Sequence, residues 1–317
     1  MYLTAPQGFM RQASVFCLQQ NSDVPCLQQP SYGRLASMKD VVALVTGASR
    51  GVGRGIALSL LAEGATVHVT GRSRSDAEAS LGGKRAGSLE GLALEAAALP
   101  GRLVVHHCDH SNDAETERVA EEIRAANSLD ILVNNAWPGY ENMVEDGDFT
   151  WPRPFWEQPV WRWDAMIGTA LRAAFMMSRA VAPTMISTQR GLIVNISFWA
   201  AQFYDGNAIY GMAKAAADKM AADFAHELRP HKVAAVALYP GLVRTEAVMQ
   251  NAEYFDLSNS ESPRFIGHVI AGLWRDPALM SKSGRVLVAA ELAREYDIAD
   301  VDGYRPVPLS PADFVKS

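Results

Sequence analysis

The feature that most constrains the fold is an apolar run that leads into a glycine-rich turn and then an amphipathic helix. Residues 41–46 are mostly β-branched or aliphatic, which is typical of a buried parallel strand. Gly47, Gly51 and Gly53 follow in the spacing T-G-x-x-x-G-x-G, and apolar residues then recur at helical spacing. Such a turn lets backbone N–H groups approach a pyrophosphate at the positive end of the helix. The pattern predicts a dinucleotide-binding unit; the alternative is a glycine loop that only closes an ordinary turn.

Strand and helix patterns alternate along the rest of the chain, which indicates parallel strands joined by right-handed crossovers. We predict an α/β fold with a Rossmann-type doubly wound parallel sheet and helices on both faces, whose ligands bind at the carboxyl ends of the strands. Residues 73–101 are expected to form a loop and a helix, and residues 243–275 a variable segment. The expected strands are 41–46, 66–70, 103–107, 129–134, 191–197, 232–239 and 285–289, and the expected helices lie near 52–63, 113–126, 160–186 and 208–228.

The domain organisation predicted from the sequence is a single domain over residues 38–317. Residues 1–37 are rich in Gln, Ser and Pro and contain one acidic residue, Asp23. They lack the apolar core of a secretory signal, so we expect a disordered N-terminal extension or an upstream translation start. An organelle-targeting peptide is the alternative. No apolar run reaches the roughly 20 residues that span a bilayer, so no membrane span is expected.

Charge and cysteine content exclude several classes of partner. The formal net charge of −6, without a block of Lys and Arg, argues against a nucleic-acid partner. The three cysteines, Cys17, Cys26 and Cys108, give neither a disulfide framework nor metal-ligand spacing. We therefore expect a cytoplasmic protein with no metal site.

Three motifs, the last with a threonine just beyond it, appear in a fixed order after the glycine turn. Asn134-Asn135-Ala136 follows an expected strand, Tyr210 and Lys214 are four residues apart on an expected helix, and Pro240-Gly241 follows another strand, with Thr245 just beyond. In this order and at these separations, the chain resembles the short-chain dehydrogenase/reductase family from the start of the predicted domain to its C-terminus. The resemblance implies an oxidoreductase that binds a nicotinamide dinucleotide. It also implies a homodimer or homotetramer formed through the helices 160–186 and 208–228.

The charge near the adenosine ribose distinguishes NADP from NAD. An acidic residue after the second strand would accept hydrogen bonds from a 2′-hydroxyl, whereas arginine pairs with a 2′-phosphate. The second strand is followed by Gly71-Arg72 with no acid, and Arg50 is a second cation in the glycine turn. We therefore predict NADP(H), with NAD as the alternative. The resemblance assigns cofactor contacts to Gly47, Ser49, Arg50, Gly51, Val52, Gly53, Arg72, Asp109, His110, Asn135, Lys214 and Thr245.

Tyr210 is the candidate acid and base for moving a proton at a substrate oxygen. An unperturbed phenol has a pKa of about 10, which is too high for a good base near neutral pH. Lys214 lies on the same helical face, and its ammonium favours the tyrosinate. The resemblance adds that this lysine binds the nicotinamide ribose.

The third member of the predicted site is a serine hydroxyl, and the sequence leaves its position open. Strand register after Asn195-Ile196 places Phe198 where the family has a serine, whereas counting back from Tyr210 favours Ser197. A slip of one residue would turn the side chain to the other face, unless a bulge restores it. We take Ser197 as the candidate catalytic donor. The asparagine that the family carries on the long helix is replaced by Ala170.

Residues 137–163 contain five of the seven tryptophans of the chain. A long irregular segment beside a cleft is often a lid or binding loop, although these rings are equally able to pack the segment onto the body or a neighbouring subunit. Together these patterns predict an NADP-dependent carbonyl reductase that interconverts a carbonyl and an alcohol on a small, lipophilic substrate. The alternative is a catalytically impaired dinucleotide-binding sensor or interaction protein, because Phe198 replaces serine.

Overall fold

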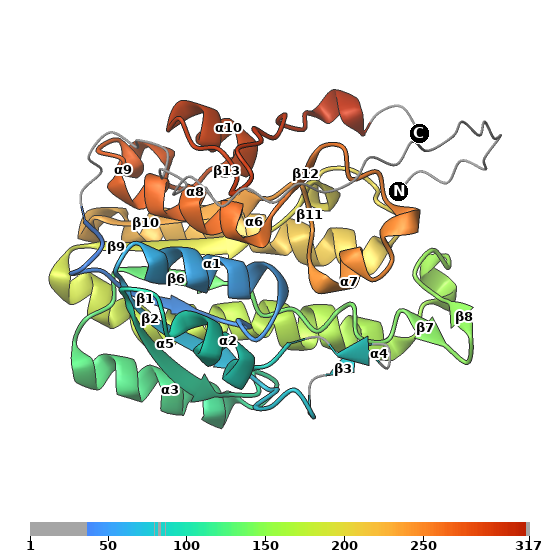
Figure 1. Cartoon of the computed structure of the whole chain (residues 1–317), viewed down its shortest axis with the longest axis horizontal. Helices are drawn as coiled ribbons and strands as arrows, with labels where there is room; N and C mark the ends of the chain where they lie inside the picture. The colour runs from blue at the N-terminus through green and yellow to red at the C-terminus, as the bar shows by residue number, and fades with distance from the viewer. Residues whose placement is uncertain (1–36, 79, 82–83, 86, 315–317) are drawn as a thin grey trace, which may run out of the picture.

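A parallel sheet of seven strands forms the centre of the protein (Figure 1). The computed structural model describes residues 37–78, 80–81, 84–85 and 87–314. The sheet order is β13-β10-β9-β6-β1-β2-β5, and every neighbouring pair is parallel. This order confirms the predicted doubly wound sheet. Its strands are β1 (Val42–Val45), β2 (Thr66–Gly71), β5 (Arg102–His107), β6 (Ile131–Asn134), β9 (Gly191–Ile196), β10 (Val233–Tyr239) and β13 (Val286–Val288).

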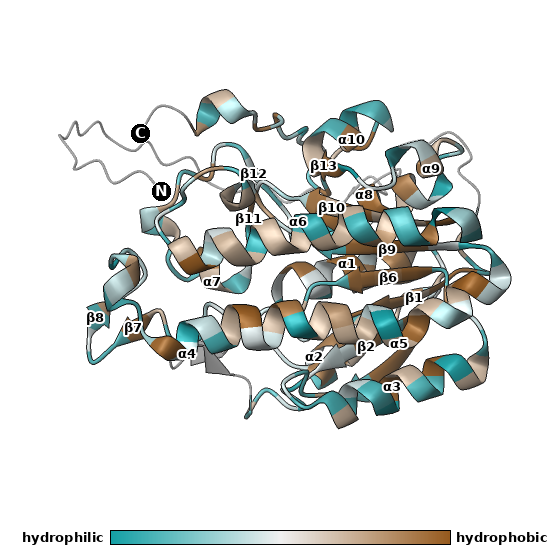
Figure 2. Ribbon diagram, turned by 180° about the vertical axis from the view of Figure 1, so that it is seen from behind, coloured by the Kyte–Doolittle hydropathy of each residue, from teal (hydrophilic) through white to brown (hydrophobic). Residues whose placement is uncertain are grey.

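Helices cover both faces of the sheet. One apolar core holds α1, α2, α8 and α10 against one face, and a second holds α3, α5 and α6 against the other (Figures 1 and 2). The helices are α1 (Gly51–Ala62), α2 (Leu89–Ala96), α3 (Asp113–Ala126), α5 (Arg172–Thr188), α6 (Ala208–Leu228), α8 (Pro263–Arg275) and α10 (Ala289–Glu295). Shorter elements are β3 (Ser80–Leu81), β4 (Lys84–Arg85), β7 (Val144–Glu145), β8 (Asp148–Phe149), α4 (Val160–Trp163), β11 (Leu242–Val243), α7 (Glu246–Met249), β12 (Ser260–Glu261) and α9 (Leu279–Lys282).

The central strands serve both cores because successive side chains point to opposite faces. Along β1, Ala43 and Val45 pack with α1 and α8, whereas Leu44 packs with the core of α3, α5 and α6. All three are fully buried. A strand buried on both faces is apolar without alternation, which explains why the strands appear in the sequence as short continuous apolar runs.

Helix α8 lies inside the segment predicted only as variable. The Ser262 side chain accepts a hydrogen bond from the Phe265 N–H at 3.2 Å, and Pro263 occupies the first turn. A serine cap followed by proline is a recognised start signal, so this helix was within reach of sequence reasoning. Its burial against α1 completes one face of the sheet.

The predicted long helix over 160–186 is divided in the structure. It begins as α4, continues as a π-helical stretch over Asp164–Leu171, and becomes regular in α5. π-helical turns are rare and frequently accompany functional sites. This stretch joins the tryptophan-rich segment to the body of the protein.

The tryptophan-rich segment, residues 137–163, is called the lid from here on. It contains the β7–β8 hairpin and, near its C-terminal end, Arg162, which is fully buried. Arg162 donates hydrogen bonds to the main chain and hydroxyl of Thr150 and to the side chain of Gln158, and its guanidinium lies 4.7 Å from the ring centroid of Trp161. These contacts give a buried cation its partners and connect separate parts of the lid to one another.

The predicted extension, residues 1–37, lies outside the described residues except for Ser37. Within the described part of the chain, no helix combines the length and apolar character needed to cross a membrane.

Candidate active site

The glycine-rich turn lies between β1 and α1, at the carboxyl edge of the sheet. Gly47 and Gly51 have φ values of +68° and +58°, a region that side chains disfavour. A Cβ at Gly53 would lie 2.5 Å from the carbonyl oxygen of Gly47 and would overlap the side-chain amide of Asn135. The fold of this turn therefore requires glycine, and the start of α1 is left with no side chain at these positions.

Two consecutive asparagines at the end of β6 have different roles. The Asn135 amide donates to the main-chain oxygens of Thr46 and Gly47, both at 3.0 Å. Asn134 donates instead to side chains of α5 and β9 at 2.9 Å. Asn135 thus stabilises the glycine turn, whereas Asn134 connects β6 to β9 and α5.

The start of α1 already holds an anionic oxygen. The Gly51 N–H donates to the Glu246 carboxylate at 2.9 Å, and Glu246 is the first residue of α7. An anion is favoured there because the helix dipole and unpaired N–H groups point outward. Ser49 is buried beneath the turn, and Val52 packs partly on the core. The residues present therefore fit the phosphates of a dinucleotide.

We expect Glu246→Gln to bind NADPH more tightly than the wild-type chain. The substitution removes a negative charge that competes with a phosphate for the same helix terminus, an effect of about two- to fivefold in Kd. Fluorescence titration of NADPH measures it, with Glu253→Gln as the control on the same segment. Weaker or unchanged binding by Glu246→Gln would contradict the expectation.

The two arginines predicted to face the adenosine ribose lie beside the glycine turn. Arg72 follows β2 and forms an ion pair with Glu141 of the lid. Burial lowers the pKa of Arg50, which also feels the charges of Glu141, Arg72 and Glu246. The structure therefore brings Arg50 and Arg72 together with two carboxylates at the predicted nucleotide site.

Asp109 and His110, two of the predicted cofactor contacts, follow β5. The Asp109 carboxylate accepts hydrogen bonds from the N–H and hydroxyl of Ser111 at 2.9 and 2.8 Å. His110 is buried and shares hydrogen bonds with Thr70 at 2.8 Å and Thr116 at 3.0 Å. Burial lowers the pKa of His110 to about 4, so the ring is neutral at physiological pH. The His110 side chain therefore connects β2 to α3, whereas Asp109 lies in the turn after β5.

Tyr210 and Lys214 lie one turn apart in the first half of α6. Asn207 caps the helix by accepting the Tyr210 N–H at 3.0 Å. The Lys214 ammonium donates to the Ile196 carbonyl at 3.2 Å and lies 5.6 Å from the centroid of the Tyr210 ring. The structure thus places the predicted pair on one helix face beside the end of β9.

Burial changes the acidity of both members of this pair. Tyr210 is only 5% exposed, and burial raises its pKa well above its ordinary value. Burial lowers the pKa of Lys214 to about 8. In the resting structure Tyr210 therefore carries its proton, as a proton donor must.

Ser197 and Phe198 follow β9 and point in different directions. The Ser197 hydroxyl donates to the main-chain oxygen of Lys214 at 3.2 Å, and it also hydrogen-bonds the Asp218 carboxylate. Phe198 has extended backbone angles, φ −165° and ψ 162°, so the alternation of the strand continues without a bulge. Its ring centroid lies 6.4 Å from that of Tyr210. This geometry differs from the predicted donor role of Ser197, because Phe198 is the residue directed toward Tyr210.

Aromatic rings of the lid surround Tyr210. Ring centroids of Trp137, Tyr140 and Trp151 lie 5.6, 6.0 and 5.3 Å from that of Tyr210. The Tyr140 hydroxyl donates to the Tyr210 hydroxyl at 3.1 Å, and the Lys214 ammonium lies 4.0 Å from the centroid of a Trp137 ring. The lid thus covers the Tyr210 hydroxyl.

Asn207 joins the lid to α6 and was not singled out from the sequence. It is buried, and its side-chain amide donates to the Trp151 carbonyl at 3.0 Å and to Gln158 at 3.1 Å, while its oxygen caps α6. An Asn three residues before Tyr210 is a recognisable helix cap, so this signal was present. Tyr140 and Trp137 have no such signal beyond the aromatic content of the lid.

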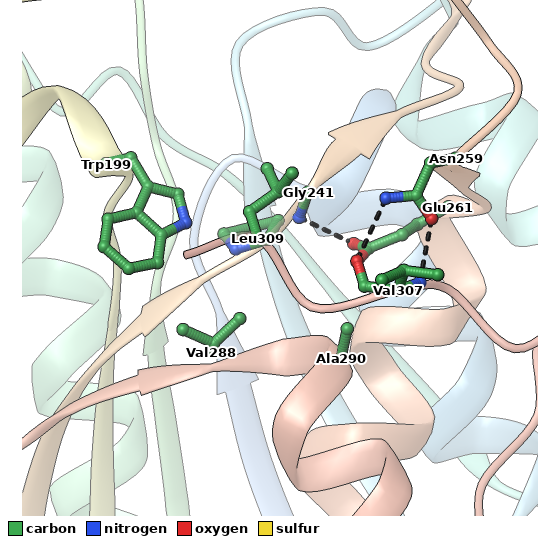
Figure 3. Close-up of a pocket in the computed structure, with 9 residues that line it drawn as sticks. Trp199, Gly241, Asn259, Glu261, Val288, Ala290, Val307 and Leu309 are labelled. Atoms are coloured by element: carbon green, nitrogen blue, oxygen red, sulfur yellow. Dashed lines mark hydrogen bonds between the residues drawn. The ribbon is translucent and has the colours of Figure 1, made fainter. Parts of the chain in front are cut away.

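The Pro240–Gly241 turn, which follows β10, is held by a buried acid. The Gly241 N–H donates to the Glu261 carboxylate at 2.9 Å, and Asn259 bonds the Val307 main chain nearby (Figure 3). Burial raises the pKa of Glu261 to about 7. Thr245 caps α7 by accepting the Val248 N–H, and its methyl group lies beside Gly51. Thr245 therefore lies beside the glycine loop.

Comparison with known proteins places this site in a family. The sequence model of the short chain dehydrogenase family matches residues 41–254. Dehydrogenase/reductase SDR family member 1 of Mus musculus is 39% identical over 288 residues, 86% of this chain and 87% of that protein. The 3-oxoacyl-[acyl-carrier-protein] reductase FabG of Escherichia coli is 31% identical over 210 residues, 65% of this chain and 74% of that protein.

Solved structures give the same assignment. A metagenomic short-chain oxidoreductase in complex with NADP has a TM-score of 0.62 and 31% identity, over 80% of this chain and 98% of the other. A dehydrogenase from Xanthomonas campestris, at 22% identity and a TM-score of 0.70, shares the fold over 86% of this chain and 98% of its own. Because the family's sequence model covers more than half of the chain, and its motifs meet at one edge of the sheet, the chain belongs to the short-chain dehydrogenase/reductase family.

Proposed function

We propose that this chain is an NADP-dependent oxidoreductase that interconverts a carbonyl and an alcohol on a small, lipophilic substrate. The observation that carries the proposal is the placement of Tyr210 and Lys214 on α6, beside the end of β9 and at the same sheet edge as the glycine turn. A dinucleotide held by that turn reaches along this edge toward the tyrosine hydroxyl.

In the proposed mechanism a bound nicotinamide supplies or accepts the hydride. Tyr210 gives its proton to the substrate oxygen during reduction and takes it back during oxidation. Lys214 stabilises the phenolate that remains, because an ammonium favours the charged form of a neighbouring acid. Lys214 lies beside the end of β9, and this position also suits a second role, in which the lysine binds the nicotinamide ribose. The closed lid excludes water from the reacting atoms.

The choice of NADP rests on the charges beside the turn. Arg50 and Arg72 lie together where an adenosine ribose would end, and a relative of known structure is described in complex with NADP. Arg72 already binds the carboxylate of Glu141, so its guanidinium is oriented to hold an anionic oxygen. Asp109, Asn135 and Thr245 complete the proposed cofactor site.

We expect Arg72→Ala to weaken NADPH binding by about 10- to 100-fold, the size of a lost charge-assisted hydrogen bond, and to leave NADH binding unchanged. The two dissociation constants, measured in parallel, test this because only NADPH carries the 2′-phosphate. Arg102→Ala is the matched control, at the opposite end of the neighbouring strand β5. Equal loss of affinity for both nucleotides would refute the assignment.

The proposed substrate class follows from the rings that enclose Tyr210. Trp137, Tyr140, Trp151 and Phe198 offer apolar faces around the hydroxyl, with few hydrogen-bonding groups. Such a site favours aldehydes, ketones and secondary alcohols with apolar substituents.

The test of the proposed function is consumption of NADPH and of NADH by the purified chain with lipophilic ketones, aldehydes and diketones. Turnover with NADPH supports the proposal. Tight nucleotide binding with no turnover on the whole panel would instead support the second candidate, a dinucleotide-binding sensor, which the phenylalanine at position 198 favours.

We also propose that the chain acts in the cytoplasm and self-associates through α5 and α6. Phe175 on α5 and Met212 on α6 are each 46% exposed, which suits a surface that another copy covers. Light scattering of the purified chain measures its mass in solution, and a monomeric mass would contradict this part of the proposal.

A further inference from the structure

The reaction centre lacks a serine hydroxyl on the Tyr210 side of β9. Ser197 is turned to the main chain of α6, and extended backbone at Phe198 presents an aromatic ring instead. A phenolate that forms among aromatic rings is costly unless a donor faces it, because an apolar surround does not solvate charge. The proposed proton transfer therefore needs a further hydrogen-bond donor.

Tyr140 is the residue whose hydroxyl meets this need. Its oxygen lies 3.1 Å from the Tyr210 oxygen, within hydrogen-bond distance. Its ring packs against Trp137 and Trp151, with centroids 5.8 and 5.7 Å away, which holds the hydroxyl in place. The side chain is 42% exposed overall, so the ring lies at the edge of the site while its hydroxyl points inward.

The direction of this hydrogen bond depends on the protonation state of Tyr210. While both tyrosines are neutral, either hydroxyl can donate. After Tyr210 has lost its proton, only Tyr140 can donate, and a hydrogen bond to a charged acceptor is stronger than one between neutral groups. Burial raises the pKa of Tyr140 to about 12, so this residue keeps its proton near neutral pH.

We propose that Tyr140 is a second catalytic tyrosine, which donates a hydrogen bond to the Tyr210 oxygen as that oxygen gives up its proton. The inference rests on the proposed function and adds a residue to it. As the carbonyl carbon receives the hydride, the C–O π electron pair moves to the carbonyl oxygen, which takes the proton of Tyr210. Tyr210 is left as a phenolate, and the Tyr140 O–H and the Lys214 ammonium stabilise it. Tyr140 itself keeps its proton throughout.

This arrangement makes the lid part of the catalytic machinery. Tyr210 and Lys214 come from α6, whereas Tyr140 comes from the lid, between β6 and β7. The donor is therefore in place only when the lid lies over Tyr210, and lid closure completes the site.

The test compares Tyr140→Phe with the wild-type chain on a substrate that the wild-type chain reduces. We expect kcat to fall by about 10- to 100-fold, the effect of losing a hydrogen bond to a charged group, with NADPH affinity and the midpoint of thermal unfolding unchanged. Tyr204→Phe is the control, because it removes a hydroxyl from a side chain that is 74% exposed, and it should keep the wild-type kcat.

Two further variants separate hydrogen bonding from packing. Adding Phe198→Ser to Tyr140→Phe supplies a hydroxyl from β9 and should recover about tenfold of the lost kcat. If Tyr140→Phe lowers the unfolding midpoint, Tyr140→His separates loss of the hydrogen bond from loss of packing. Histidine keeps an N–H donor on a ring of another shape, so Tyr140→His should be more active than Tyr140→Phe.

The outcomes distinguish this inference from the function on which it rests. A wild-type chain that turns over no substrate overturns both. An active wild-type chain with unchanged kcat in Tyr140→Phe overturns the role of Tyr140 alone, as does a loss of kcat that neither Phe198→Ser nor Tyr140→His reduces.

Discussion

Tyr210→Phe is expected to lower kcat by about 10²–10⁴-fold, the contribution of a positioned general acid. The substitution removes one oxygen from a buried ring and leaves the ring contacts of Trp137 and Trp151 in place. The glycine turn is untouched, so the dissociation constant of NADPH should stay at the wild-type value. Steady-state kinetics and nucleotide titration, made on the same preparation, give both quantities.

The control for this variant is again Tyr204→Phe, which should leave kcat unchanged. Loss of NADPH binding together with kcat in Tyr210→Phe would show that the ring supports the fold of the site, and would contradict the assignment of Tyr210 as acid. Unchanged kcat would remove the proposed mechanism altogether.

Gly55→Ala is expected to give the largest loss of stability among single-methyl substitutions at the glycines of α1. A Cβ at Gly55 would overlap the carbonyl group and side chain of Pro263, where α8 crosses α1. Because the obstacle includes main-chain atoms of a packed helix, relief requires α8 to move away from the core. We expect the free energy of unfolding to fall by about 1–3 kcal/mol, the usual cost of overpacking a core. Urea denaturation followed by circular dichroism measures it.

Gly168→Ala is the matched control. It also adds a methyl group to a helical glycine, but the nearest atom, the Cβ of Asp164, lies 3.9 Å away, which is ordinary contact. It should leave stability unchanged or raise it by about 0.5–1 kcal/mol, because alanine has the higher helix propensity. An equal loss in both variants would show that helical glycine itself, rather than the crossing of α1 and α8, is the cause.

The sheet was predictable from the sequence because its strands are buried on both faces and so form apolar runs between helical periods. Tyr210 and Lys214 became candidates because their helix follows the strand that ends near Ser197, in the motif order of the family; helical spacing by itself was a weak signal. Local sequence patterns predicted neither the π-helical stretch after α4 nor the partners of Arg162, because both depend on tertiary contacts.

Whether Ser197 or Phe198 faces Tyr210 depends on a single feature of the backbone after β9. Had a bulge occurred at Phe198, Ser197 would face Tyr210; the extended backbone puts the phenylalanine there instead. Tyr140 could not be found from the sequence, because no period relates a loop residue to a helix 70 positions away. Such contacts depend on how the loop packs in three dimensions. The order of aromatic residues of similar size along the sequence does not determine that packing.

The uneven placement of tryptophan has an optical consequence. Five of the seven indoles lie in the lid, and Trp137 and Trp151 are packed against the Tyr210 ring. Indole emission overlaps the absorption band of a reduced nicotinamide, so energy transfer between them depends on the separation of lid and cofactor. The intrinsic fluorescence of this chain therefore arises mainly from the lid, and we expect its colour and intensity to report nucleotide binding beside this segment without an added label.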